Sequence, residues 1–210
     1  DINNELFKFD PSLLSNKGKV LITYKNFNQY KDKLKDYFDI IGTIDSYISI
    51  VTLVKEFESN NLNICYTRYK SCNKPIIQFK NVWHPYLSKK DNIVCNSLNI
   101  GNSNPNNIIL TGPNAGGKST FIKAISLNLL FSQTFGISFC SEATITPFTL
   151  INTYLNIPDC KNKESLFEAE MNRAKNHLQN LKELREHELA FIVMDEIFSS
   201  TNPEEGIAGA

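Results

Sequence analysis

One glycine-rich stretch combines residue types and a spacing that could do chemistry. It reads Thr111-Gly112-Pro113-Asn114-Ala115-Gly116-Gly117-Lys118-Ser119-Thr120 and satisfies the pattern G-x-x-x-x-G-K-[ST]. In this pattern the glycines let backbone N–H groups close around phosphate oxygens. We therefore predict that residues 112–120 bind a nucleoside triphosphate, that Lys118 reaches its β- and γ-phosphates, and that the Ser119 hydroxyl coordinates Mg²⁺.

The elements on either side of this stretch must position it. The apolar run Ile108-Ile109-Leu110 predicts a strand before it, and apolar residues at helical spacing follow from Phe121. The N-terminus of that helix would direct a partial positive charge at the same phosphates. The alternative is a glycine turn that carries Lys-Ser by coincidence. The order strand, motif, helix favours phosphate binding.

Two carboxylates follow a second predicted strand further along the chain. The run Ala190-Phe191-Ile192-Val193-Met194 is typical of a buried parallel strand, and Asp195 and Glu196 come directly after it. They would emerge at the carboxyl edge of the sheet, where open α/β folds bind ligands. We predict that Asp195 binds Mg²⁺, directly or through water, and that Glu196 orients and polarises the attacking water. Alone, Asp-Glu after a strand is equally typical of a solvated turn.

These motifs resemble those of the MutS family of DNA mismatch-recognition ATPases. The glycine-rich stretch is similar to the phosphate loop of that family, which usually has Met at the position of Ala115. Residues 165–171, Ser-Leu-Phe-Glu-Ala-Glu-Met, resemble the family's Ser-Thr-Phe-x-x-Glu-Met stretch. Residues 195–208 resemble its second nucleotide motif and the helix that follows, although Phe198-Ser199-Ser200 replaces the usual Gly-Arg-Gly. The resemblance covers roughly residues 40–210.

The resemblance implies an α/β fold, namely a P-loop NTPase domain of the ABC type with a mostly parallel sheet. A helical segment would precede this domain, and its C-terminal end would be missing. We assign residues 1–72 to the helical segment and 73–210 to the ATPase domain, because turn-forming residues lie at 60–63 and 72–75. The chain has no initiator Met and ends within a helical pattern, so we expect it to be an excerpt of a longer protein.

The resemblance also implies an activity and partners. ATP and Mg²⁺ would be the cofactors, and hydrolysis would switch a homo- or heterodimer with composite ATP sites on mismatched or irregular double-stranded DNA. The formal net charge is zero, so no global basic field indicates nucleic acid binding, and the DNA contacts would lie outside this excerpt. Two alternatives remain open: another ABC-type ATPase, for chromosome maintenance or transport, and a nucleotide-binding module without turnover.

Ser165 has two compatible interpretations. Ser165-Leu-Phe-Glu168 is a capping-box pattern, and apolar residues at helical spacing follow it from Phe167 to Leu181. Ser165 would then only cap a helix. In the family that the chain resembles, the serine at this position reaches the γ-phosphate bound by the partner subunit. Since a helix N-terminus is itself an anion site, we expect Ser165 to act in trans as well.

The remaining segments predict structure more than chemistry. Val20–Tyr24 is typical of a strand, and a helical pattern from Tyr30 to Val51 follows, with Gly42 as a point where it would bend or divide. Ile76–Val82 alternates like a strand. His84 precedes a proline, which favours a packed structural residue over a metal ligand or base. A gapped alignment puts Ile93 where the family stacks an aromatic residue on adenine.

The composition indicates a soluble intracellular protein. Five cysteines are present, an odd number with no C-x-x-C pair, which favours reduced thiols over a disulfide framework. A metal site from Cys65, Cys72 and His84 is conceivable, but no second ligand pair stands at zinc spacing. We find no signal peptide and expect no membrane-spanning stretch.

Overall fold

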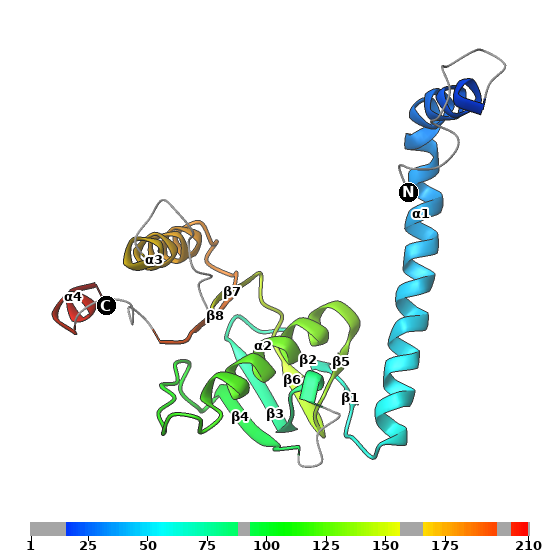
Figure 1. The fold of residues 1–210 in the computed structure, drawn as a ribbon. Coiled ribbons are helices and arrows are strands. Elements are labelled where there is room, and N and C mark those ends of the chain that lie inside the picture. The colour runs from blue at the N-terminus through cyan, green and yellow to red at the C-terminus, as the bar shows by residue number, and fades with distance from the viewer. Residues whose placement is uncertain (1–15, 88–92, 156–165, 197–202, 210) are drawn as a thin grey trace. The chain divides into compact units, whose positions relative to one another are not determined.

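The structure is a computed structural model that describes residues 16–87, 93–155, 166–196 and 203–209. By its contacts the chain divides into two compact units, Asp1–Leu53 and Val54–Ala210. Figure 1 shows the elements, which are in chain order α1 (Asn16–Ser59), β1 (Cys65–Tyr66), β2 (Arg68–Tyr69), β3 (Ile76–Val82), the 3₁₀ turn η2 (Pro85–Leu87), β4 (Asn96–Gly101), α2 (Lys118–Phe135), β5 (Ile137–Ser138), β6 (Glu142–Ile145), β7 (Leu150–Tyr154), α3 (Leu166–Lys182), β8 (Ala190–Met194) and α4 (Pro203–Gly209).

Helix α1 is one uninterrupted helix of 44 residues. The strand predicted at Val20–Tyr24 is wrong, because these residues lie within α1 and the Thr23 hydroxyl donates to the Lys19 carbonyl one turn back. β-branched residues favour strands only where a neighbouring strand can pack against them. Gly42 does not divide the helix, which continues through it, and the Ser46 hydroxyl donates to the Gly42 carbonyl at 2.7 Å.

Apolar side chains along α1 are exposed within the described part of the chain. Ile41 and Ile48 are 61% and 60% exposed. The stretch Lys17–Ser59 contains an 18-residue window of mean hydropathy 1.4, so by length and composition alone it passes the test for a membrane-crossing helix. This finding differs from the expectation that no such stretch exists. The difference arises because the aspartates within the helix are few enough to leave the average apolar.

The centre of the second unit is a four-stranded sheet with the order β2-β6-β3-β4. Strand β3 begins and ends where the alternation predicted, at Ile76 and Val82, and it pairs antiparallel with both β4 and β6. Only β2 and β6 run parallel in this sheet. The prediction of a mostly parallel sheet is therefore wrong for the described residues. Between β3 and β4 the described residues contain only the short turn η2, and an antiparallel pair needs no crossover helix.

Helix α2 lies across one face of this sheet and closes the hydrophobic core (Figure 1). Ile125 and Leu129 of the helix pack with Ile77 and Phe79 of β3, and all four side chains are buried. Two further sheets have two strands each, the antiparallel pair β1-β5 and the parallel pair β7-β8. The pair β7-β8 joins the same core through Phe191, whose ring lies 5.9 Å from that of Phe148.

Polar contacts fix how α2 lies on the sheet. The Asn128 side chain is completely buried and donates to the carbonyls of Trp83, at 3.1 Å, and Ala124, while its Oδ1 accepts the Phe139 N–H at 2.6 Å. One turn later, the Gln133 amide donates to the Phe148 carbonyl and accepts the Phe148 N–H. Because buried backbone groups need partners, these two amides couple the helix to segments on both sides of it.

We expect Asn128→Ala to destabilise the protein, because the change leaves the Phe139 N–H and the Trp83 carbonyl buried without their partner. The free energy of unfolding, measured by urea denaturation, should fall by about 2–4 kcal/mol. Thr134→Ala is the matched control, since Thr134 also bonds a carbonyl of α2 but is exposed, and it should change the value by less than about 0.5 kcal/mol. Equal effects of the two substitutions would contradict the proposed anchoring.

Candidate functional site

The glycine-rich loop, residues 111–117, leads directly into α2. The helix begins at Lys118, three residues before the position that the apolar spacing indicated. Gly117 is its N-cap, with φ 85° and ψ 11°, and it has no side chain to accept a hydrogen bond from the first turn. The N–H groups at this helix start are therefore without a side-chain cap, which leaves them available to an anion.

The loop is exposed and closed by its own backbone. The Gly116 N–H donates to the Pro113 carbonyl at 3.0 Å, and a Cβ on Gly116 would lie 2.9 Å from that oxygen. Position 116 therefore accepts glycine only, because the atom that a larger residue would displace belongs to the backbone. Ala115 has φ 63°, a left-handed conformation that is unusual for a residue with a Cβ. The glycine-rich spacing has a physical basis in this tight turn.

Lys118 lies over the loop that precedes it. Its Nζ donates to the carbonyl oxygens of Gly112 and Pro113, each at 2.9 Å. Ser119 follows in the first turn of the helix and is half-buried. A lysine in this place holds a positive charge against the loop, where phosphate oxygens would compete with the two carbonyls for its protons.

The strand predicted before the loop is absent. Ile108–Leu110 is not part of a strand in the structure, and Ile109 is 90% exposed. Apolar residue types do indicate a strand, but a strand also needs a neighbour for its N–H and carbonyl groups. In the described ranges no strand pairs with this run.

The second half of the candidate site lies at the end of β8. Strand β8 comprises Ala190–Met194 and pairs parallel with β7, as its composition indicated. Asp195 follows it, half-buried, and its N–H donates to the Tyr154 carbonyl at 3.0 Å. Glu196 is exposed and has φ 50°, a strained conformation for a non-glycine residue. Strain of this kind is often found at functional positions.

The structure does not join the two halves through direct contacts. Within the described residues, no hydrogen bond or ion pair links Asp195 or Glu196 to Lys118 or Ser119. The donors are nevertheless of the kinds that Mg²⁺ takes, since Ser119 offers a hydroxyl and Asp195 a carboxylate. Ser165, the remaining candidate, lies outside the described residues.

A polar cluster on α3 supports the end of β7, and the sequence patterns did not predict it. On α3, Glu170 and His177 are buried, whereas Met171 and Leu178 are 40% and 60% exposed. Arg173 donates to the Thr153 carbonyl at 3.0 Å. The apolar spacing indicated the helix correctly, but the side chains that face the sheet are the polar ones between those positions.

Burial affects the titration of this cluster. It lowers the pKa of His177, next to the Arg173 charge, and neither ring nitrogen has a hydrogen-bond partner among the described residues. Burial and the Glu170 carboxylate raise the pKa of Tyr154 to about 12. Both groups are therefore neutral near pH 7. Since the Tyr154 carbonyl holds the Asp195 backbone, the cluster positions the acidic end of β8 without adding charge beyond Glu170 and Arg173.

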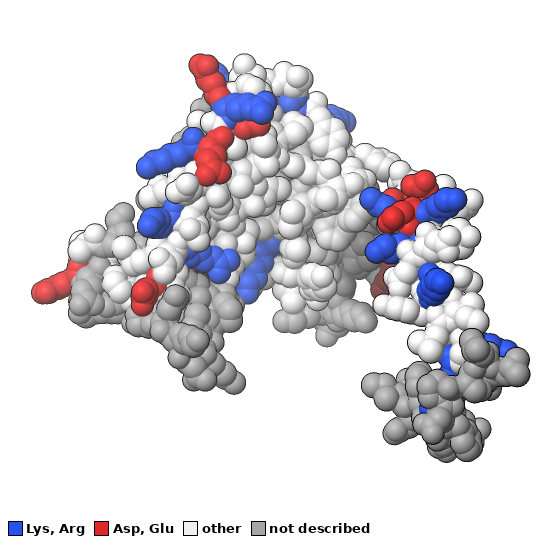
Figure 2. Space-filling model, turned by 90° about the horizontal axis from the view of Figure 1, so that it is seen from above, with Lys and Arg blue, Asp and Glu red and all other residues white. Residues whose placement is uncertain are grey.

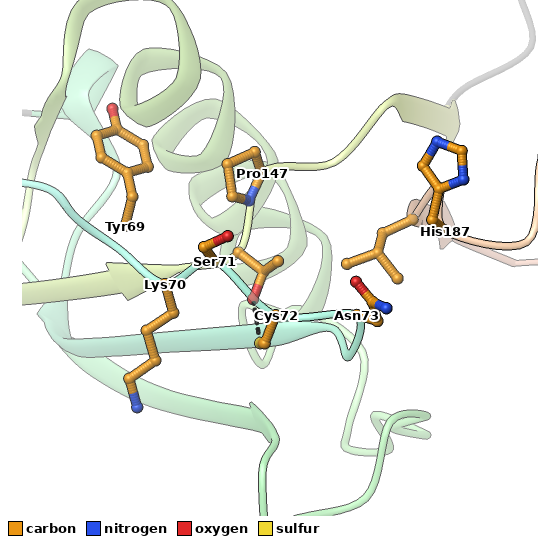
Figure 3. Close-up of a pocket in the computed structure, with 9 residues that line it drawn as sticks. Tyr69, Lys70, Ser71, Cys72, Asn73, Pro147 and His187 are labelled. Atoms are coloured by element: carbon orange, nitrogen blue, oxygen red, sulfur yellow. Dashed lines mark hydrogen bonds between the residues drawn. The ribbon is translucent and has the colours of Figure 1, made fainter.

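A hollow among the described residues lies away from the candidate site. A cavity of about 290 Å³ is lined by residues 69–73, by Thr146 and Pro147, and by His187 and Leu189 (Figure 3). In its wall the Cys72 sulfur and the Thr146 hydroxyl oxygen are 3.5 Å apart. None of the lining residues comes from the glycine loop or from Asp195-Glu196, so this cavity is separate from the candidate site.

The surface drawn in Figure 2 gives no electrostatic indication of a nucleic acid. On this face, lysines and arginines are interspersed with aspartates and glutamates over the described residues, and no broad basic area covers it. This agrees with the formal net charge of zero. His84 is half-buried, burial lowers the pKa of its ring, and the ring lies 6.0 Å from that of Tyr86.

One protein-family model covers the glycine-rich loop, α2 and the acidic residues after β8. Residues 108–210 match the family model described as MutS domain V. The chain is 29% identical over 191 residues to the DNA mismatch repair protein MSH3 of Debaryomyces hansenii, which covers 88% of the chain and 18% of that protein. It is 26% identical over 212 residues to the DNA mismatch repair protein MutS of Caldicellulosiruptor saccharolyticus, covering 99% and 24%.

A third relative bears a different name. Endonuclease MutS2 of Leuconostoc mesenteroides is 31% identical over 134 residues, which is 63% of the chain and 16% of that protein. The chain thus spans about a fifth of the length of the curated relatives it matches. The chain is therefore similar to MutS domain V over residues 108–210 and to relatives named MSH3, MutS and MutS2.

We expect Gly116→Ala in the full-length protein to weaken ATP binding roughly tenfold or more, which corresponds to about 1.4 kcal/mol. The added methyl group would displace the Pro113 carbonyl and open the turn. Gly42→Ala is the matched control, because nothing lies within 4 Å of a Cβ there and alanine favours the helix. Calorimetric titration with ATP compares the two, and unchanged affinity in Gly116→Ala would contradict a role for this turn.

Proposed function

We propose that the chain is part of the ATPase domain of a MutS-type protein and that it binds and hydrolyses ATP. The observation that carries this proposal is the glycine loop in front of α2, with an uncapped helix start and Lys118 folded over it. The similarity of residues 108–210 to MutS domain V supports the proposal as well. Residues 112–120 would hold the triphosphate.

Each site residue then has a role in the reaction. Lys118 and the N–H groups at the start of α2 neutralise charge on the β- and γ-phosphates, which is the main requirement in phosphoryl transfer. Ser119 and Asp195 would hold Mg²⁺, which supplies further charge neutralisation when bound. Glu196 orients the attacking water and accepts its proton. The exposed position of Glu196 after β8 leaves its carboxylate accessible to such a water.

Hydrolysis would switch a dimer between states on mismatched or otherwise irregular double-stranded DNA, in repair or recombination. The names of the MSH3 and MutS relatives support mismatch repair, and DNA would bind through regions outside this stretch. In this proposal the protein is soluble and intracellular. Ser165, before the N-terminus of α3, would complete the ATP site of the partner subunit, and Ile93 would present an aliphatic surface to the adenine.

Lys118→Ala should weaken ATP binding and abolish turnover in the full-length protein. Losing one or two hydrogen bonds to a charged ligand corresponds to roughly 10- to 150-fold in affinity. Lys123→Ala, which removes the same charge from the next turns of α2, should leave both quantities near their original values. Binding is measured by calorimetry and turnover by phosphate release. Parental affinity and turnover in Lys118→Ala would end the phosphate-loop assignment.

Glu196→Gln should retain ATP but slow its hydrolysis on the order of a hundredfold or more, because the amide cannot accept a proton from water. Glu186→Gln, an exposed glutamate before β8, is the control and should hydrolyse ATP at the original rate. A single-turnover measurement separates chemistry from product release. If Glu196→Gln turns over normally, another residue activates the water.

The trans role of Ser165 can be isolated in a mixed dimer of Ser165→Ala and Lys118→Ala subunits. The Ser165→Ala subunit keeps the intact loop, and the Lys118→Ala subunit still offers it a serine. If the serine acts in trans and the sites fire independently, this dimer should retain about one site's turnover. A serine acting in cis predicts an inactive mixed dimer, because the remaining loop would lack its own serine.

A further inference from the structure

Two cysteines far apart in the sequence meet beside the four-stranded sheet. The sulfur atoms of Cys65 and Cys140 are 3.6 Å apart, although 75 positions separate them in the chain. Cys65 opens β1 and is half-buried, whereas Cys140 follows β5 and is completely buried. Both are free thiols, and in the described ranges no three metal-binding side chains gather into a metal site.

The backbone on either side holds the two sulfurs together. Strands β1 and β5 pair antiparallel, with Cys65 opposite Ser138, and the Thr67 and Ser138 hydroxyls are hydrogen-bonded at 2.8 Å. Beside Cys140, the Phe139 carbonyl accepts the Trp83 N–H and the Ser141 N–H donates to the Lys80 carbonyl at 2.8 Å. The pair is therefore preorganised by bonds outside it, and a chance approach of two mobile side chains does not account for it.

We propose that Cys65 and Cys140 form a reversible redox site, in which a peroxide converts the two thiols into a disulfide. A disulfide has a sulfur–sulfur distance of about 2.05 Å, so the sulfurs must approach by roughly 1.5 Å. In intracellular proteins such bonds are usually transient and redox-sensing. This inference concerns a site separate from the glycine loop and does not depend on the proposed ATPase.

The chemical environment gives the two thiols different roles. A hydrogen bond from Cys140 lowers the pKa of Cys65, and the Ala143 N–H lowers it further, although burial opposes both. The neighbouring Cys65 sulfur and burial raise the pKa of Cys140. Cys65, which is also the more accessible of the two, is therefore the thiol that reacts first, because the thiolate is the nucleophile.

The reaction balances in two steps. The Cys65 thiolate attacks one oxygen of hydrogen peroxide, the O–O bond breaks, and the products are a sulfenic acid on Cys65 and one water after proton uptake. The Cys140 sulfur then attacks the Cys65 sulfur, the S–O bond breaks, and the second water leaves with the Cys140 proton. Two thiols are oxidised and one peroxide is reduced. A dithiol such as dithiothreitol reverses the reaction by exchange.

The disulfide would tie the start of β1 to the end of β5 around the segment that contains β3, the glycine loop and α2. Closing a loop of this length restricts the unfolded chain more than the folded one. The melting temperature should therefore rise on oxidation, by roughly 10 °C. Phe139, next to Cys140, packs edge-on against Phe57 and Trp83, so the bond would also form beside the aromatic cluster at the end of α1.

The test uses the full-length protein with the other cysteines of this sequence replaced, Cys72→Ser, Cys95→Ser and Cys160→Ser, so that they cannot react. After hydrogen peroxide treatment and alkylation, digestion without reductant should give a peptide pair joined through Cys65 and Cys140 and lighter by two hydrogens. The melting temperature should rise, and dithiothreitol should restore both the separate peptides and the original value. In Cys65→Ser, made in the same background, peroxide should leave the melting temperature unchanged.

The outcomes that overturn the proposal are equally specific. If the two residues only pack together, both thiols will remain open to alkylation after peroxide treatment and denaturation. Oxidation of Cys65 to the sulfinic acid without a linked peptide, or an equal rise of the melting temperature in Cys65→Ser, would also refute it. Because the peptide analysis is made on a protein that keeps both cysteines, the result stands even if Cys65→Ser does not fold.

Discussion

The docking of α2 on the four-stranded sheet is the constraint on which the rest of the candidate site depends. Asn128 and Gln133 bond backbone groups on both sides of the helix, and Ile125 and Leu129 fill the space above β3. These contacts fix the helix along its length, and thereby its first residue. Lys118 and the uncapped N–H groups are in this way presented by a rigid element, while the loop before them remains exposed.

Two of the sheets have different relations to the candidate site. The four-stranded sheet carries α2 and packs against the hydrophobic core, so it supports the helix mechanically. The parallel pair β7-β8 is short and is followed by Asp195 and Glu196, and the Tyr154 carbonyl accepts the Asp195 N–H. The candidate residues thus lie in the loop before α2, in the first turn of α2 and just after β8. Outside the regular hydrogen bonding of helix and strand, the backbone can adopt the positive φ of Ala115 and Glu196.

Sequence patterns predicted those elements whose signal is local. The alternation of β3, the apolar run of β8 and the helical spacing of α3 each depend on neighbouring residues, and the structure confirms all three. Pairing depends on distant residues, so the direction of the strands beside β3 and the unpaired state of Ile108–Leu110 could not be predicted from composition. The same limit applies to α1, in which Val20–Tyr24 is helical like the residues on either side of it.

In the candidate site, too, features with a local sequence signal could be predicted, whereas contacts between distant residues could not. The glycine spacing and the order of loop and helix identified residues 112–120, and the turn at Gly116 gives that spacing a steric reason. The cluster of Glu170, Arg173 and His177 was not predicted, because polar residues between apolar ones normally indicate the solvent face of a helix. The contact between Cys65 and Cys140 could not be foreseen at all, since it requires the pairing of β1 with β5.

The central claim is that the glycine loop recognises phosphates. The most direct measurement compares the equilibrium binding of ATP, ADP, AMP and adenosine to the full-length protein in the presence of Mg²⁺. If the loop and Lys118 supply the binding energy, ATP and ADP should bind roughly a hundredfold or more tightly than AMP and adenosine, about 2.7 kcal/mol. Equal affinity for all four compounds would contradict the claim, because the nucleoside alone would then account for binding.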